Sequence, residues 1–355
     1  MTLQLVSAGE SHGPALVAIV TGLPAGLVLE QETIDADLRR RQQGYGRSPR
    51  QQIETDEVEI LAGLRHGRTL GTPLALVVRN RDHANWEWGM SPWPPEGEPS
   101  GKGTKPVTLP RPGHADLAGA LKYGLADVRD ALERASARHT AVHVAAGAVA
   151  KTLLRAIHVT VEGAVLDEEG LRARIDEARA ERDTVGGTVE VRARNVPPGF
   201  GSYATKEDRL DARLAAALMG IQAVKGVEIG DGFALAERRG SEAHDEILGA
   251  TGGELRRETN HAGGIEAGVS NGEEIVVRAA MKPLASVDLE TREAGEALVE
   301  RSDVAAVEAL AVVAEAAVAF ELARAAREKF GGDALPDFVA AYDAYVERIP
   351  WRTTH

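Results

Sequence analysis

The stretch RHTAVHVAAGAVAKTLLRAI, residues 138–157, decides the fold class that we expect. Small and apolar residues recur in it at helical spacing, with abundant alanine and glycine, and the segment 115–136 has the same character. Helices with so few polar positions pack closely inside a protein instead of lying on its surface. The alanine-rich segment 303–330 is expected to form another long helix, which ends near Gly331 and Gly332.

Segments with the pattern of β-strands lie on both sides of these helices. Strands and helices follow one another in blocks, without the regular βαβ rhythm of a doubly wound sheet. No linker separates two parts of the chain, so we expect one large domain, residues 1–355. Strands are expected at 3–8, 15–20, 52–64, 72–80, 157–166, 188–196 and 273–283, and further helices at 168–183 and 206–224.

The composition restricts the class of protein. The chain has 355 residues, a net charge of −13 and no cysteine. The charge argues against general nucleic-acid binding, which depends on neutralising phosphates. The absence of cysteine excludes disulfides and thiolate metal sites and favours a reducing compartment. We find neither a signal-peptide pattern nor an apolar run of membrane-spanning length, so we expect a soluble protein of the cytoplasm.

Several common motifs are missing. The stretch GKGTK at 101–105 has glycine after its first lysine and fails the phosphate-loop pattern, and no G-x-G-x-x-G follows a strand. The zinc-binding pattern H-E-x-x-H does not occur, and we expect no metal site. Residues 85–106, rich in proline, glycine and tryptophan, predict a long surface loop of the kind that is often functional.

Five arginines gather in DLRRRQQGYGRSPR, residues 37–50. Guanidinium groups bind carboxylates and phosphates in a bidentate manner, so a small polyanionic ligand is one interpretation. A solvated helix end with scattered ion pairs is the other. Sparse aromatic residues and the acidic net charge disfavour a nucleic-acid patch. The five are Arg39, Arg40, Arg41, Arg47 and Arg50.

Two histidines lie in turns. His12 follows Ser11 in AGESHGPALVAIVTGLPAG, residues 8–26, and is either a catalytic group or an ordinary loop residue. His114 follows a Pro-Gly turn at or just before an expected helix, where it can act as a general acid or base near neutral pH. Alternatively, Asp116 caps that helix and His114 has no role.

Two further stretches carry polar groups on expected helices. In ERASARHTA, residues 133–141, helical spacing puts Arg134 and Arg138 on one face, and ion pairs with neighbouring acids are the simpler explanation. In ERSD, residues 300–303, Asp303 is either a catalytic carboxylate or a cap of the long helix.

Taken together, these stretches resemble the chorismate synthase family and occur in its order. Each alone is a weak signal, and the ordered set is specific. The resemblance implies an α+β fold, a layered sandwich of antiparallel sheets around helices. The matching stretches are GESHG (9–13), GLPAG (22–26), RRQQGYGR (40–47), RPGHAD (111–116), KYG (122–124), ERASARHTA (133–141), KGVEIGDGF (225–233), GGIEAGVSNG (263–272) and ERSD (300–303).

The resemblance also implies an activity. Members of the family are lyases that convert 5-enolpyruvylshikimate 3-phosphate to chorismate and phosphate by a 1,4-anti-elimination, in the shikimate pathway to the aromatic amino acids. The reaction has no net redox change, yet the family requires reduced FMN. Some members reduce their own flavin, which associates NADP with the family. A homotetramer is implied as well. The substrate has a phosphate and two carboxylates, which agrees with the arginine cluster.

Site residues follow from the same resemblance. His12 is implied to protonate the departing phosphate, His114 to lie beside the flavin ring, and Asp303 to act with flavin N5 in removing the substrate proton. The implied substrate-binding residues are Arg41, Arg47, Arg50 and Arg138. The implied cofactor-binding residues are Arg134, Ala135, Ser136, Gln222, Ala223, Ala267, Lys282, Ser286 and Arg301.

The chain departs from the family pattern in three places. The stretch KPLAS, residues 282–286, and the segment after Ile157 are shorter than usual, and Ala267 stands where glycine is common. Two rival functions remain open. A flavin reductase would need a nicotinamide pocket, for which no dinucleotide motif is present. A non-catalytic anion- or RNA-binding protein would leave His12, His114 and Asp303 without a role.

Overall fold

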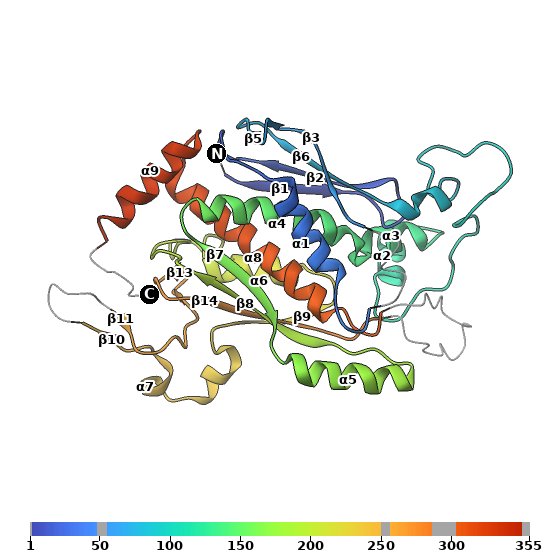
Figure 1. Ribbon diagram of the computed structural model, residues 1–355. Helices are drawn as coiled ribbons and strands as arrows, with labels where there is room; N and C mark the ends of the chain where they lie inside the picture. The colour runs from blue at the N-terminus through green and yellow to red at the C-terminus, as the bar shows by residue number, and fades with distance from the viewer. Residues whose placement is uncertain (1, 48–54, 250–255, 286–302, 350–355) are drawn as a thin grey trace.

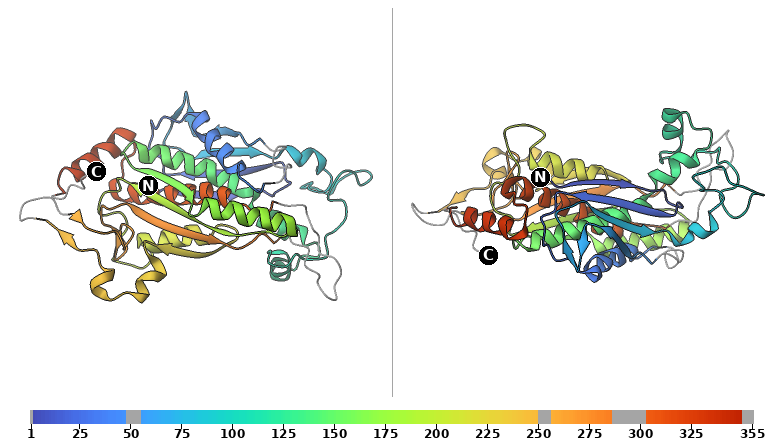
Figure 2. Two further views of the ribbon diagram at one scale, coloured as in Figure 1. Left: turned by 60° about the horizontal axis from the view of Figure 1, so that its bottom comes forward. Right: turned by 90° about the horizontal axis from the view of Figure 1, so that it is seen from above.

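A layer of helices lies between two four-stranded antiparallel sheets in the computed structural model of this protein (Figure 1). The structure describes residues 2–47, 55–249, 256–285 and 303–349. Seen from above, in the right view of Figure 2, the first sheet lies in front of the helices and of the second sheet. The predicted α+β sandwich of antiparallel sheets around helices is therefore confirmed.

The first sheet has the strand order β1-β2-β6-β3. Alternate residues of β2, Leu16, Ala18 and Val20, face the helices and are fully buried, as the alternating pattern predicted. Its strands are β1 (Gln4–Ala8), β2 (Ala15–Thr21), β6 (Leu74–Arg79) and β3 (Val58–Ala62).

The second sheet has the order β7-β8-β14-β9. No strand was expected from the sequence around residue 226, but the chain forms the edge strand β9 there, because pairing with β14 supplies the hydrogen bonds. The strands are β7 (Thr160–Val165), β8 (Gly187–Arg194), β14 (Ile275–Met281) and β9 (Val224–Ile229). Three further antiparallel pairs are short: β4 (Leu64–Arg65) with β5 (Arg68–Thr69), β10 (Ile247–Leu248) with β11 (Arg256–Arg257), and β12 (Ile265–Glu266) with β13 (Val269–Ser270).

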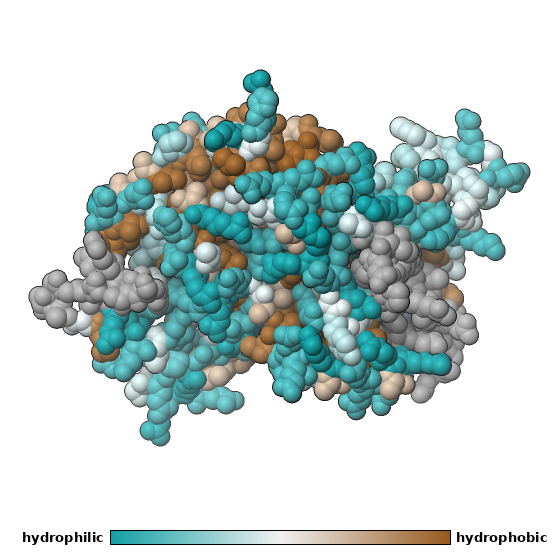
Figure 3. Space-filling model, in the orientation of Figure 1, coloured by the Kyte–Doolittle hydropathy of each residue, from teal (hydrophilic) through white to brown (hydrophobic). Residues whose placement is uncertain are grey.

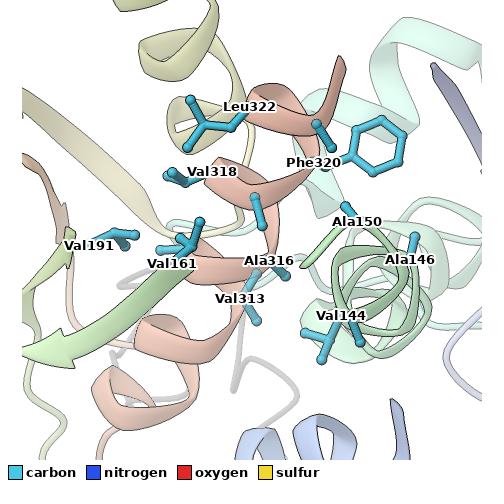
Figure 4. Close-up of a cluster of buried hydrophobic side chains, with 14 of the residues drawn as sticks. Val144, Ala146, Ala150, Val161, Val191, Val313, Ala316, Val318, Phe320 and Leu322 are labelled. Carbon is cyan, nitrogen blue, oxygen red and sulfur yellow. The ribbon is translucent and has the colours of Figure 1, made fainter. Parts of the chain in front are cut away.

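The helices α4 (Thr140–Arg155) and α8 (Val307–Phe330) form the centre of the middle layer. Figure 4 shows side chains of α8 between those of α4 and those of Val161 and Val191 in the second sheet. The remaining helices are α1 (Gln31–Gln42), α2 (Asp116–Tyr123), α3 (Arg129–Ala135), α5 (Glu168–Glu181), α6 (Leu210–Met219), α7 (Gly240–Ala243) and α9 (Leu335–Val346), with 3-10 turns at Arg81–Asn85, Ala137–His139 and Gly232–Glu237.

The segment 115–136, expected as one helix, is divided into two. Gly124 ends α2 in the left-handed conformation, with φ 68°, and α3 follows after a short connection. The C-terminal helix α9 was not expected; it packs Phe338 and Tyr342 against Phe330. Within the described residues, no helix is both long enough and apolar enough to cross a membrane.

Candidate active site

His12 lies in the turn between β1 and β2 and is held from several sides. Its ring stacks on Trp86 with centroids 4.0 Å apart. Its Nδ1–H donates to the carboxylate of Glu133 at 2.9 Å, and its backbone N–H donates to the same carboxylate at 2.8 Å. His83 donates through Nδ1 to the His12 carbonyl at 2.9 Å. His12 is therefore a fixed group and not an ordinary loop residue.

A buried carboxylate joins two of the implied substrate-binding arginines. Asp56 accepts from Arg41 at 3.1 Å and from Arg138 at 2.7 Å, and its side chain is fully buried. Burial lowers the pKa of Arg41 to about 10, against the opposing effect of Asp56. Arg138 also donates to Asn80, which in turn holds the His12 turn through the carbonyls of Glu10 and Gly13. One network thus connects these arginines to His12.

Asp303 forms an ion pair with Arg47, with the charged atoms 2.8 Å apart and both side chains largely buried. Burial lowers the pKa of Arg47, and Asp303 opposes that shift. The helix α8 starts at Val307 with Ala306 as its N-cap, so the interpretation of Asp303 as a helix cap is wrong. Arg47 follows the turn at residues 44–46. The carbonyl of Gly46 accepts a hydrogen bond from the N–H of Val304 at 2.8 Å, so the backbones next to Arg47 and Asp303 are also joined.

The two remaining described arginines of this cluster form ion pairs elsewhere. Arg40 binds Asp37 and the buried Glu315, each at 2.8 Å, and Arg39 pairs with Glu32. For these two residues the interpretation as ion pairs at a helix end holds. Arg50 lies outside the described residues.

His114 lies two residues before α2, as expected. Its Nδ1 hydrogen-bonds to Asp116, and Arg111 reaches the same carboxylate at 3.0 Å through Nε. Burial raises the pKa of Asp116, but the hydrogen bonds from His114 and Arg111 outweigh burial and hold this pKa well below its usual range. Asp116 therefore orients His114, and the alternative in which Asp116 only caps the helix is wrong.

Lys282 connects His114 with two other implied cofactor-binding residues. Its Nζ donates to the carbonyl of Gly113 at 2.9 Å, and its backbone N–H donates to the carbonyl of Ala223 at 2.9 Å. Gln222, next to Ala223, donates through Nε2 to Nε2 of His139 at 3.1 Å. Residues from three distant parts of the sequence thus meet beyond the end of β14.

Ser136 lies at a break in the helical stretch. Its backbone is extended, with ψ 141°, between α3 and the 3-10 turn. The expectation that Arg134 and Arg138 share a helical face is wrong for this reason. Ser136 donates to Ser11 Oγ at 3.3 Å, and its carbonyl accepts from Nδ1 of His139 at 2.8 Å. Ser136 therefore links the His12 turn to Gln222 through His139.

Arg134, at the end of α3 beside Ala135, donates to the carbonyls of Ser7 and Gly9. Ser7 Oγ is 2.9 Å from Nε2 of His143, whose pKa burial lowers to about 4. Burial lowers the pKa of His139 as well.

Ala267 lies far from the other implied cofactor-binding residues. It forms the β12–β13 turn, near the start of β14, whereas Lys282 follows the end of β14. A seven-residue strand is ~20 Å long. Ala223 and Ala267 both have positive φ, 66° and 50°, which is unusual for alanine. Ser286 and Arg301 lie outside the described residues.

Sequence reasoning missed Asp56, Asn80 and Glu133. Each is a common polar residue at an inconspicuous position, and only its burial against a named partner gives it a role. Asp56 had a weak signal, since it is an acid in the segment 52–64, which was expected to be a half-buried strand.

Comparisons with known proteins show which family this chain is similar to. The family model described as chorismate synthase matches residues 3–326. The chorismate synthase of Rubrobacter xylanophilus is 52% identical over 380 positions, covering 97% of this chain and 96% of that protein, and that of Pelobacter propionicus is 50% identical over 393 positions, covering 98% and 99%. A crystal structure of a chorismate synthase superimposes with a TM-score of 0.79 at 36% identity and covers 99% of both chains.

These alignments are longer than the 355 residues of this chain, so the relatives contain residues that it lacks. This agrees with the expectation that the chain is shorter than the family pattern. The ordered motifs, the sandwich of sheets and helices, and the match over nearly the whole length all point to one family of lyases. The chain belongs to the chorismate synthase family.

Proposed function

We propose that this protein converts 5-enolpyruvylshikimate 3-phosphate to chorismate and phosphate by a 1,4-anti-elimination that requires reduced FMN, in the cytoplasm, as a step of the shikimate pathway. The observation that carries the proposal is the single network that joins His12, Arg138, Arg41 and Asp56 through Asn80. It supports the proposal because it connects the turn that carries a proton donor with two cations, and the departure of a phosphate requires both.

The arginines have different roles in this proposal. Arg47 binds the substrate: its Nε is buried and has no hydrogen-bond partner among the described residues, so it has a donor to offer. Arg41 donates to Thr140, Asp56 and the carbonyl of Arg138, so it mainly holds the loop that carries Arg138 and adds positive potential. An anionic substrate compensates for the cost of keeping these charges out of water.

Two groups handle protons. His12 protonates the departing phosphate, because its ring is fixed and Nδ1 is already engaged with Glu133. Asp303 takes part in removing the proton from the ring of the substrate, since its carboxylate pairs with Arg47, the cation that binds the substrate. General acid–base catalysis of this kind typically supplies about 10²–10⁴-fold in rate.

The residues of the site fit FMN. Ser136, Gln222, Ala223, Lys282 and the His114 turn are linked to one another by hydrogen bonds, although they come from four segments. Lys282 offers a cation for a phosphate, and His114 offers an oriented imidazole for the ring. Reduced FMN, when bound, supplies transient electron density that weakens the bond to the leaving phosphate.

We also propose that the protein assembles as a homotetramer through the outer face of the first sheet. That face carries apolar side chains that are exposed or half-buried, and Figure 3 shows hydrophobic residues along the top of the molecule, over this sheet. A large exposed apolar patch marks an interaction surface. Assembly would also explain the position of Ala267, which lies apart from the rest of the site in its own chain, if this residue contacts the cofactor of a second copy. The apolar residues are Val6, Val17, Ile19, Leu61 and Ala75.

The test is anaerobic. Purified protein is mixed with 5-enolpyruvylshikimate 3-phosphate and photoreduced FMN, and chorismate absorbance and released phosphate are followed together. Equal amounts of both products, formed only with reduced flavin, are expected. Folded protein that releases neither product would overturn the proposal. A second reaction starts from oxidised FMN and contains no other reductase. If chorismate and phosphate form there only after NADPH is added, the protein also reduces its own flavin.

A further inference from the structure

Glu133 forms three hydrogen bonds with the His12 turn, although the proposed function gives it no role. Its side chain is 1% exposed, and its carboxylate accepts both the backbone N–H of His12, at 2.8 Å, and the Nδ1–H, at 2.9 Å. Its own carbonyl accepts the N–H of Ser11 at 3.1 Å. One residue of α3 thus holds the turn by its backbone and the imidazole by its side chain.

The remaining contacts of the ring prevent it from turning. Trp86 lies against it with an angle of 18° between the planes. The indole is itself fixed, because its Nε1–H donates to Asp82 at 2.9 Å and the guanidinium of Arg129 lies 5.0 Å from its ring centre. Arg129 is also 3.8 Å from the Glu133 carboxylate and partly balances its charge. The orientation of His12 is therefore set before any substrate binds.

A carboxylate can only accept, so Nδ1 of His12 must carry a proton in both the neutral and the charged ring. The proton that the ring gains and loses is then the one on Nε2. On the basis of the proposed function, we infer that Glu133 is a positioning residue: it keeps the Nδ1 proton in place and so presents Nε2 as the only atom of His12 that passes a proton to the substrate.

The first test does not depend on activity. Full-length protein labelled with ¹⁵N-histidine is studied by NMR at neutral and alkaline pH, and the His12 signals are assigned by their loss in His12→Gln. The neutral ring should carry its proton on Nδ1, whereas free histidine in water prefers Nε2. A neutral His12 with its proton on Nε2 would overturn the inference, whatever reaction the protein catalyses.

The second test uses Glu133→Gln. The amide replaces one of the two accepting oxygens with a donor, so His12 loses its partner at either the backbone N–H or Nδ1. We expect kcat to fall about 10- to 100-fold, a part of what general acid catalysis supplies, with KM changed by less than about threefold. In a His12→Ala background, the same change should have no further effect on kcat.

The control is Glu315→Gln, which places an amide at another carboxylate that is only 2% exposed, bound to Lys151 and Arg40 in the middle layer. It should lower the melting temperature and leave kcat unchanged. If Glu133→Gln reduces kcat equally with and without His12, Glu133 is merely structural and the inference fails. Wild-type protein that forms no chorismate would instead refute the proposed function and leave the NMR result to decide the inference.

Discussion

Single charged residues in this protein act through their partners. Asp56 is the clearest case, because two buried guanidiniums share its carboxylate. Removing one partner of a buried ion pair is far more costly than removing an exposed one, since an uncompensated charge remains away from water.

We predict that Asp56→Asn lowers the free energy of unfolding by about 3 kcal/mol. Urea unfolding followed by circular dichroism measures this change. Glu59→Gln is the matched control, because its ion pair with Arg79 is exposed and such pairs contribute little to stability. Equal effects of the two substitutions would show that Asp56 does not compensate the buried arginines.

His143 gives the stability a dependence on pH. Burial lowers its pKa from 6.5 to about 4, so between these values the unfolded chain binds a proton that the folded protein does not. Its contribution is complete above pH 6.5 and is lost as the pH falls towards 4. We predict a loss of about 2 kcal/mol from this group between pH 7.5 and pH 5.

The comparison is between wild type and His143→Gln, which keeps a polar group beside Ser7 but does not titrate. Unfolding free energies are measured for both at pH 7.5 and pH 5. The variant should lose less stability than wild type over this range. Parallel pH dependence in the two proteins would exclude a neutral, buried His143 as the cause.

At the scale of elements, the contact between α4 and α8 determines the spacing of the middle layer. A Cβ atom at Gly147 would lie 2.3 Å from Cβ of Ala316 and 2.6 Å from its Cα, so the two helices cross without space for a methyl group. The Asp303 turn leads into α8, and Ser136 and Arg138 precede α4. The distance between these helices therefore affects the geometry of the site.

We predict that Gly147→Ala destabilises the protein by about 2 kcal/mol, although alanine favours helices by itself. The crowded contact forces α4 and α8 apart. Thermal unfolding checks the stability, and the KM for 5-enolpyruvylshikimate 3-phosphate checks the site. Gly240→Ala serves as control, because a Cβ there meets open space apart from His244 at 4.0 Å. A Gly147→Ala protein as stable as wild type would contradict the close crossing.

At the scale of the whole molecule, the two sheets have different outer faces. The second sheet carries ion pairs on its outer side, among them Arg192 with Glu190 and Arg278 with Glu190. The first sheet carries apolar groups, with Val6 69% exposed.

Both sheets enclose one layer of helices, and these helices come from both halves of the chain. For this reason we propose that residues 1–355 form a single domain.

We predict that Val6→Glu dissociates the assembly and leaves the fold of the subunit intact, because a charge on the first sheet opposes burial of its apolar face. Light scattering coupled to size-exclusion chromatography measures the mass, and circular dichroism the fold. Thr160→Lys, an exposed position on β7 of the second sheet, should leave the mass unchanged. A tetramer that survives Val6→Glu and dissociates with Thr160→Lys would assign the interface to the other sheet.

The sequence by itself determined the elements and the residues of the motifs. The small residues of 138–157 required close neighbours, and each alternating strand required one buried face. His12, His114, Arg47 and Asp303 stood out because the ordered set of motifs that carries them is specific. The prediction failed where local pattern does not decide, as at the extended Ser136, at the strand β9 and at α9, which depends on contact with Phe330.

Only the tertiary structure decided which groups meet. Asp56, Asn80 and Glu133 are ordinary polar residues in the sequence, and each acquires a role because the fold buries it against charged or hydrogen-bonding groups far away in the chain. The distance between Ala267 and Lys282 likewise follows from the length of β14. Local propensity acts over a few residues, whereas the cost of burying an unpaired charge or donor is set by residues that only the fold brings together.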